Sequence, residues 1–265
     1  SLVAYWTLNS TSIANGNYTD YFGRFNASIN GNPTNVSGIF EGENATKFDG
    51  VDDYLSVSDT AQLSVVTTTN FSIGFWFKTP DSNLLTNITG DQVSTIHLVG
   101  KSASGAHEYI FRMANNTLSL GFITFNNAGS GNNQTTAQIN QLNISTWYNI
   151  VGTVNSSTIC IILNGITRTC TVSATTHQNG AAALEIGTRG ADRPSRFYNG
   201  TLAQLFIFNK TLQSSEILSW TSYTAELMTQ NGFLNTTDPI KYRFLQYQAT
   251  LRNNDTKSTP ILSRV

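Results

Sequence analysis

Apolar side chains recur at every second position along several short segments, and this period restricts the fold more than any other feature. Residues 71–78 read Phe-Ser-Ile-Gly-Phe-Trp-Phe-Lys, which places four large apolar side chains on one face of a strand. Similar runs, separated by Gly, Asn and Ser clusters, occur at residues 2–8, 53–57, 97–99, 109–113, 118–125, 148–154, 158–163, 184–186 and 201–208. The pattern predicts an all-β chain folded as a two-sheet antiparallel sandwich or jelly roll. One short helix is predicted at 214–218, where Ser-Ser-Glu-Ile-Leu follows residues that can cap a helix.

The length of 265 residues allows one large sandwich followed by an appendage. We predict a jelly-roll domain at 1–221 and a strand-bearing C-terminal extension at 222–265. Within the extension, Tyr242, Phe244, Tyr247 and Ala249 alternate loosely with polar residues. A terminal strand without a place in its own sheet must pair with an exposed edge. The extension is therefore expected to dock on its own domain or on a neighbouring subunit.

Few residues carry charge, which limits the classes of partner. Only 12% of the residues are charged, and the formal net charge is −1. Such a composition supplies no basic stripe for nucleic-acid phosphates and no polybasic segment for anionic lipids. No apolar run approaches the roughly 18 residues that span a bilayer, so we expect no membrane insertion. The chain starts at Ser1 without a Lys/Arg-then-apolar leader, and we take the numbering to begin after a removed signal peptide or at an expression boundary.

Asparagines in the N-glycosylation pattern Asn-x-Ser/Thr occur at roughly twice the chance frequency for this composition. They are Asn9, Asn17, Asn26, Asn35, Asn44, Asn70, Asn87, Asn115, Asn133, Asn143, Asn155, Asn199, Asn209, Asn235 and Asn254. N-linked glycans are added to exported chains, so the excess indicates an extracellular or cell-surface glycoprotein. The alternative is that loops rich in Asn, Ser and Thr produce the pattern by chance. The regular steps of 8 to 9 residues between the first five acceptors favour glycans spread over a surface.

The two cysteines, Cys160 and Cys170, flank a segment with Asn164-Gly165 at its middle. If residues 164–166 form a three-residue loop with Gly165 left-handed, the cysteines lie directly opposite each other on paired strands. This spacing predicts a cross-strand disulfide that fixes the hairpin register and indicates an oxidising compartment. Two buried free thiols or a metal pair are the alternatives, and the absence of a nearby histidine disfavours the metal.

Several further motifs occur in a fixed order between Leu2 and Trp220. They lie at residues 2–6, 20–26, 47–55, 71–78, 98–101, 147–151, 163–165, 186–187, 200–209 and 212–217. In this order the motifs resemble the laminin-G-like domains of the concanavalin A-like lectin/glucanase superfamily. The resemblance implies a two-sheet antiparallel jelly roll, and it implies binding more often than catalysis. Within residues 47–55 we expect a turn at Gly50. Core positions are expected at Phe48, Val51, Tyr54, Leu55 and Val57.

Asp49, Asp52 and Asp53 form the densest acidic cluster of the chain. Closely spaced oxygen ligands suit a hard cation, and the resemblance implies Ca²⁺ near this region. The family usually carries an aspartate in its closing strand, where this chain has Ala203-Gln204, so one donor is missing. The alternative is that the aspartates form turns by hydrogen-bonding their own backbone.

Catalytic patterns are weak. Sandwich glucanases use carboxylates in the pattern Glu-x-Asp-x-x-Glu, which this sequence lacks. Glu41 and Glu43 form a close pair, but beside a glycine and an acceptor asparagine they indicate a loop. His97, Lys101 and His107 show no metal or nucleophile spacing, and the Gly-x-Ser-x-Gly motif is absent. We therefore predict that the protein is not an enzyme.

The four tryptophans are Trp6, Trp76, Trp147 and Trp220. An aromatic face can stack on the C–H groups of a sugar. Core packing is favoured for the first three, because they fall in motif strands or at strand ends.

Two functions agree best with these sequence features, and a third is less favoured. The favoured one is a non-enzymatic, N-glycosylated structural subunit of a surface filament, sheath or particle, which self-associates through its sandwich and its C-terminal extension. The alternative is a calcium-dependent, lectin-like adhesion module that binds a glycan or a cell-surface protein. A secreted glycan-active enzyme comes third.

Overall fold

The computed structural model describes residues 1–39, 43–65, 70–79, 95–103, 105–114, 119–126, 134–140, 142–172, 177–190 and 196–218. All of these residues belong to the compact unit Ser1–Ser222. The predicted C-terminal extension at 222–265 lies outside the described residues, so the structure does not test how it docks.

The strands in the described part of the chain form two antiparallel sheets, as the sequence predicts. Sheet A has the order β15-β14-β13-β8-β17-β6-β5, and β1 also pairs with β17. Its strands are β1 (Leu2–Trp6), β5 (Thr34–Ser37), β6 (Asn44–Asp49), β8 (Phe71–Lys78), β13 (Trp147–Val154), β14 (Thr158–Leu163), β15 (Thr167–Val172) and β17 (Asn199–Phe208).

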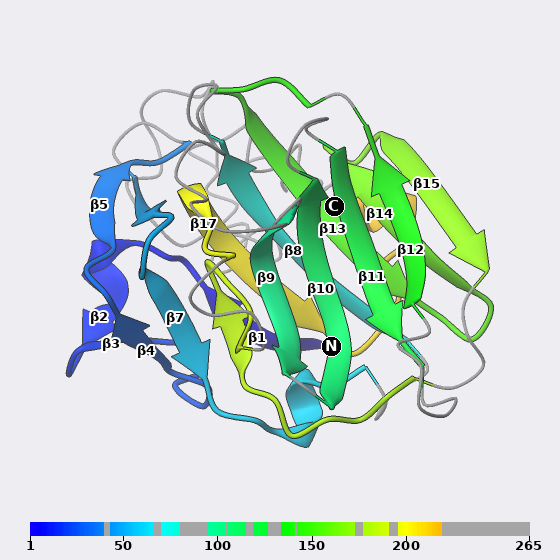
Figure 1. Ribbon diagram of the computed structural model, residues 1–265, viewed down its shortest axis with the longest axis horizontal. Helices are drawn as coiled ribbons and strands as arrows, with labels where there is room; N and C mark the ends of the chain where they lie inside the picture. The colour runs from blue at the N-terminus through cyan, green and yellow to red at the C-terminus, as the bar shows by residue number, and fades with distance from the viewer. Residues whose placement is uncertain are drawn as a thin grey trace, which may run out of the picture. The chain divides into compact units, whose positions relative to one another are not determined.

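Sheet B has the order β12-β11-β10-β9-β16-β7-β4-β3-β2. Its strands are β2 (Ile13–Ala14), β3 (Asn17–Tyr18), β4 (Ala27–Asn30), β7 (Tyr54–Val57), β9 (Thr95–Ala103), β10 (Ala106–Ala114), β11 (Ser119–Phe125), β12 (Gln134–Ile139) and β16 (Leu184–Ile186). Two short 3-10 turns, η1 (Ser10–Ser12) and η2 (Ala61–Leu63), lie between strands. Figure 1 shows β9 to β12 as one layer in front of β8, β13 and β14. The architecture is the predicted two-sheet antiparallel jelly-roll sandwich.

The main core lies between the two sheets, where aromatic side chains from both sides meet. Phe75 of sheet A packs edge-on against Phe111 of sheet B, with ring centroids 4.9 Å apart. Phe122 of sheet B lies over Gly152 of sheet A so closely that a Cβ at this glycine would come within 2.7 Å of the ring. A glycine at this position therefore permits the close approach of the two layers.

The predicted alternation holds along β8, because Phe71, Ile73, Phe75 and Phe77 all belong to the main core. The expectation for Val51 is wrong, since its side chain is 58% exposed. Val51 lies in the turn between β6 and β7, just after Gly50, which has φ +81°. In that turn the chain has left the sheet, and the side chain no longer faces the core.

The other core positions expected around that turn behave differently from Val51. Phe48, Leu55 and Val57 are buried in the main core. Tyr54 is partly buried and packs against Phe197, with ring centroids 6.1 Å apart.

Residues 214–218 are helical, as predicted. The backbone N–H of Gln213 donates to the Glu216 carboxylate at 2.9 Å, which satisfies one amide at the start of the helix. Ile217 is buried, and Glu216 also pairs with Lys210. Within the described residues, no helix is long and apolar enough to cross a membrane.

Candidate functional site

The three aspartates of the acidic cluster lie together at the turn between β6 and β7. One carboxylate oxygen from each of Asp49, Asp52 and Asp53 lies within 4.8 Å of the others. The buried Asp53 accepts the backbone N–H of Asn32 on Oδ1 at 2.6 Å and that of Asp49 on Oδ2 at 3.0 Å. Oδ1 of Asp49 accepts the N–H groups of Val51 and Asp52 at 2.8 and 3.3 Å. The cluster therefore shapes its own turn.

These hydrogen bonds bear on the predicted Ca²⁺ site. Burial raises the pKa of Asp53; the two backbone hydrogen bonds oppose the rise, and the negative charges of Asp49 and Asp52 add to it. Three carboxylate oxygens already accept backbone N–H groups, so Asp52 and Oδ2 of Asp49 are the donors best placed for a cation. Calcium takes six to eight oxygens, so these residues fit part of a site and need further oxygens to complete it. Calcium binding stays a prediction.

Two of the tryptophans lie apart from the main core. Trp76 packs against Ala45 and Ala203 in a separate small cluster, and the partly buried Trp147 packs against this cluster. Trp76 pairs directly with Ala203 of β17. Its neighbours Phe75 and Phe77 face the core, so Trp76 lies on the outer face of sheet A.

The other two tryptophans do not contribute to this face within the described structure. Trp6 is fully buried in the main core, and its Nε1–H donates to the Phe25 carbonyl at 2.7 Å. Trp220 lies outside the described residues.

Two polar residues that are close in sequence to the alanines of the Trp76 cluster are hydrogen-bonded to each other: Gln204, at the bulge in β17, follows Ala203, and Glu43 lies two residues before Ala45. Gln204 has φ +52°, a left-handed conformation that is uncommon for a residue other than glycine. Its side chain is 3% exposed, Nε2 donates to Glu43 Oε2 at 3.3 Å, and Oε1 has no hydrogen-bond partner within the described part of the chain. Burial raises the pKa of the Glu43 carboxyl to about 7, although the hydrogen bond from Gln204 lowers it. We call Glu43, Trp76, Trp147 and Gln204 the tryptophan site.

Sequence reasoning did not find this site as a whole. Glu43 is assigned to a loop by its neighbours, and no spacing links it to Gln204, which is 161 positions away in the chain. The one available signal at Gln204 is that glutamine follows alanine where the resembling family usually carries an aspartate. The tryptophans are recognisable from sequence as candidates for sugar stacking, but the sheet face that they occupy is not.

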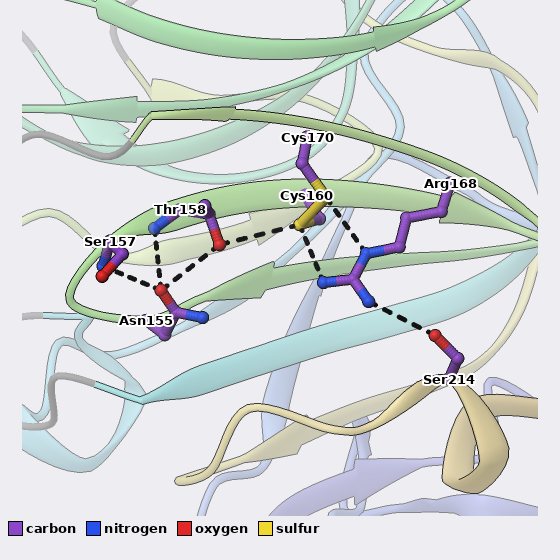
Figure 2. The surroundings of a disulfide bond; sticks show 7 residues. All are labelled: Asn155, Ser157, Thr158, Cys160, Arg168, Cys170 and Ser214. Atoms are coloured by element: carbon purple, nitrogen blue, oxygen red, sulfur yellow. Dashed lines mark hydrogen bonds between the residues drawn. A yellow bond between two sulfur atoms is a disulfide. The ribbon is translucent and has the colours of Figure 1, made fainter.

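The predicted disulfide between Cys160 and Cys170 is confirmed. The two cysteines are directly paired across β14 and β15, and both Asn164 and Gly165 have positive φ in the connecting loop. Figure 2 shows the Arg168 guanidinium beside both sulfur atoms, with one nitrogen reaching Ser214 at 3.3 Å. This contact links the disulfide hairpin to the start of the helix.

The acceptor asparagines differ in exposure. Asn9 is buried, and its Oδ1 accepts the N–H of Thr11 at 3.0 Å. Figure 2 shows Asn155, whose Oδ1 accepts the N–H groups of Ser157 and Thr158. The exposed acceptors are Asn26, Asn35, Asn70, Asn143 and Asn209, and the partly buried ones are Asn17, Asn44, Asn155 and Asn199. Asn87, Asn115, Asn133, Asn235 and Asn254 lie outside the described residues. Glycosylation therefore stays a prediction, and the exposed asparagines are its best-placed positions.

Lys101 and the two described strand histidines make contacts in the interior. Lys101 is fully buried and pairs with Glu108 and, at 2.7 Å, with Asp59. Nδ1 of His107 lies 2.6 Å from Oγ of Ser102. His97 lies on β9, the same strand as Lys101 and Ser102, and its side chain is buried.

The chain belongs to the concanavalin A-like lectin/glucanases superfamily, whose laminin-G-type model matches residues 49–218. Comparison with curated proteins found no match. Among solved structures, the binding domain of Paraclostridial Mosquitocidal Protein 1 superposes with a TM-score of 0.63 at 15% identity, covering 84% of this chain and 52% of that chain.

Two further structures show the same fold. One is domain 4 of AbnA, an extracellular GH43 arabinanase from Geobacillus stearothermophilus in complex with arabinotriose, with a TM-score of 0.55 at 14% identity over 83% of this chain and 98% of that domain. The other is botulinum neurotoxin type C, described as dependent on two ganglioside molecules for cell entry, with a TM-score of 0.60 at 17% identity over 84% of this chain and 51% of that one. The chain thus spans about half the length of the toxin structures that it matches.

Proposed function

We propose that this chain is a non-enzymatic, extracellular binding module for a carbohydrate-bearing partner, and that the tryptophan site holds the sugar. The observation that carries the proposal is the buried Oε1 of Gln204, which lacks a hydrogen-bond partner in the described structure. A buried acceptor without a partner costs about 1–3 kcal/mol. A sugar hydroxyl would satisfy it, while the indoles of Trp76 and Trp147, in the cluster that contains Ala203, would pack on the apolar C–H face of the ring.

The exposure of the four residues suggests how a ligand would enter. Trp76 and Gln204 are almost fully buried, whereas Trp147 and Glu43 are partly exposed. A ligand would therefore meet Trp147 and the Glu43 carboxyl first. With a pKa of about 7, this carboxyl exists in both donor and acceptor forms near neutral pH, and both forms can bind hydroxyl groups.

The related structures support a binding function. The superfamily takes its name from lectins as well as glucanases, and the similar arabinanase domain is described with a bound arabinotriose. The similar neurotoxin is described as interacting with gangliosides. These observations favour binding over hydrolysis.

The test is a glycan array probed with the full chain and with two variants. Trp147→Ala removes a partly exposed indole of the site, and Phe22→Ala removes an exposed aromatic ring between β3 and β4 as a matched control. We expect wild type and Phe22→Ala to share their hits, and Trp147→Ala to bind at least about tenfold more weakly. No bound glycan, or equal binding by all three proteins, would overturn the proposal, and release of reducing sugar from a hit would replace it with an enzymatic function.

The structural role in a filament, sheath or particle remains a second prediction. It depends on the extension at 222–265, which lies outside the described residues, and on glycans whose attachment is untested. The calcium dependence of the lectin-like alternative rests on the aspartate cluster and is tested separately below.

A further inference from the structure

Two exposed aromatic rings lie together in the loop at residues 19–26, which connects β3 to β4. Tyr21 is 40% exposed and Phe22 is 43% exposed, and no other aromatic residue of the described structure is as exposed. Their rings meet edge to face, with centroids 5.2 Å apart. Together they form an apolar surface on which a further group can pack.

Hydrogen bonds hold this loop in a defined conformation. The N–H of Gly23 donates to the carbonyl of Asp20 at 2.7 Å, which closes a tight turn whose two central residues are the exposed aromatics. The buried Asp20 carboxylate accepts the N–H of Tyr5 on Oδ1 at 2.8 Å and that of Arg24 on Oδ2 at 3.2 Å. The Arg24 guanidinium lies 4.7 Å from the centre of the Phe22 ring. The rings are therefore positioned before another group packs on them.

The same loop ends in an N-glycosylation acceptor. Asn26 is exposed and is followed by Ala27 and Ser28, which completes the pattern Asn-x-Ser. Oδ1 of Asn26 accepts the N–H of Asp20 at 3.1 Å, so the side chain reaches back to the residue before Tyr21. A glycan is attached to Nδ2 and leaves Oδ1 free to accept, so glycosylation is compatible with this hydrogen bond.

We propose that Asn26 carries an N-linked glycan whose first sugar residues pack on the rings of Tyr21 and Phe22. The C–H groups of a sugar form an apolar face that stacks on an aromatic ring. A glycan attached at Asn26 is already held beside the turn, so it loses little translational freedom in making this contact. The loop connects strands of sheet B, whereas the tryptophan site is on sheet A, so the inference goes beyond the proposed function and does not depend on it.

The modification requires a donor in which the glycan is linked to a lipid diphosphate. Nδ2 of Asn26 forms a bond to the anomeric carbon of the first sugar. The bond between that carbon and the diphosphate breaks, and the lipid diphosphate leaves with the electron pair. The proton lost from Nδ2 passes to a base of the transferring enzyme.

The experiment is a double-mutant cycle on the full chain, secreted from a host cell that attaches N-linked glycans. Ser28→Ala removes the acceptor pattern but keeps the Asn26 side chain, Phe22→Ala removes one ring, and the double variant completes the cycle. Glycans at other asparagines are common to the four proteins and cancel. Glycopeptide mass spectrometry measures the occupancy of Asn26, and thermal unfolding gives each melting temperature. Tyr21→Ala replaces Phe22→Ala in the cycle if the latter does not fold.

Two controls isolate the sugar contact. The Ser28 hydroxyl also donates to the carbonyl of Ser56 at 3.1 Å, and Ser28→Ala removes this bond as well. The four proteins are therefore made again without N-glycosylation, in an oxidising bacterial periplasm where the disulfide still forms. Ser37→Ala is the matched variant, because it removes the acceptor pattern of the exposed Asn35 on β5.

We expect Asn26 to be glycosylated in most of the secreted wild-type protein. Ser28→Ala should lower the melting temperature about 2–4 °C more in the glycosylated protein than in the bacterial one, a shift typical for the loss of one aromatic contact in a domain of this size. This extra loss should disappear in the Phe22→Ala background. The effect of Ser37→Ala should be the same with and without the Phe22 ring.

An unmodified Asn26 in the secreted protein would overturn the proposal. An extra loss on Ser28→Ala that does not depend on the Phe22 ring would do the same, as would a loss of equal size in the bacterial proteins. If Ser37→Ala depends on Phe22 as strongly as Ser28→Ala does, the contact does not belong to the Asn26 glycan and the proposal is wrong. Each of these results leaves the proposed function standing, because the glycan array reports on the tryptophan site.

Discussion

Replacing Lys101 with methionine should strongly destabilise the fold. Lys101 and Glu108 are both completely buried, and Nζ of Lys101 also donates to the carbonyl of Gly180 at 2.9 Å. The same Glu108 oxygen accepts the N–H of Gly180 at 3.1 Å. These contacts join β9 and β10 to the segment before β16. Removing the cation leaves a buried carboxylate without its counter-charge, at a cost of about 3–5 kcal/mol.

The pairing of Lys101 with Asp59 adds little to this figure. The Asp59 side chain is 38% exposed, and ion pairs open to solvent contribute about 0–1 kcal/mol. The pKa of Glu108 bears more strongly on the result. Burial raises that pKa and Lys101 lowers it, so the variant should have a higher folded-state pKa than wild type. Because a raised carboxyl pKa favours folding at low pH, the loss of stability should be smaller at pH 5 than at pH 8.

The assay is urea unfolding followed by tryptophan fluorescence at the two pH values. Lys47→Met, at an exposed position of β6, is the matched control and should change stability by less than about 0.5 kcal/mol. The double variant Lys101→Met/Glu108→Leu should recover a large part of the loss, because it removes both charges. A loss below about 1 kcal/mol, a loss independent of pH, or additive effects in the double variant would refute the reasoning.

Three other regions give predictions of their own. Changing Cys160 and Cys170 together to serine should lower the free energy of unfolding by about 2–3 kcal/mol, because the disulfide closes a short loop of sequence separation 10. Urea unfolding measures this change, and an unchanged free energy of unfolding would contradict the prediction. Glu43 has a folded-state pKa of about 7, above its usual value, so its contribution to stability is present below about pH 4.5 and is lost as pH rises through 7. Glu43→Gln should flatten the curve of stability against pH between about pH 4.5 and 7. A curve unchanged by this substitution would show that Glu43 does not have the raised pKa. Asp53→Asn should lower the melting temperature equally in Ca²⁺ and in EDTA, because it disturbs backbone hydrogen bonds. Asp52→Asn should instead abolish any stabilisation of the protein by Ca²⁺. If Ca²⁺ does not raise the melting temperature of the wild-type protein, the calcium prediction is wrong.

Much of the sandwich is predictable because its strands have a strong period of two. The core strand β8 and the hairpin of β14 and β15 follow directly from alternation and from the position of Asn164-Gly165. The short strands β4 and β5 are not predictable in this way, since most of their positions are polar and partly or fully exposed. Their pairing with β7 and β6 depends on contacts between segments, which local periodicity does not encode.

The candidate sites likewise include one that is predictable from neighbouring residues and one that depends on contacts between distant segments. Asp49, Asp52 and Asp53 are neighbours in sequence, and their proximity in space is predictable from the turn that they form. The tryptophan site combines Glu43 and Gln204, which are 161 positions apart, so only the sheet order brings them together. Sequence also cannot show that Gln204 adopts a left-handed conformation inside a strand, because that depends on the bulge in β17.

The most direct test of the carbohydrate-binding role is isothermal titration calorimetry with the strongest neutral glycan from the array. The comparison is between wild type and Gln204→Leu, which removes the buried acceptor but keeps a side chain of similar size. We predict saturable binding to wild type, weakened roughly 3- to 10-fold in the variant by loss of one hydrogen bond. Equal affinity of the two folded proteins, or no heat of binding to wild type, would contradict the account.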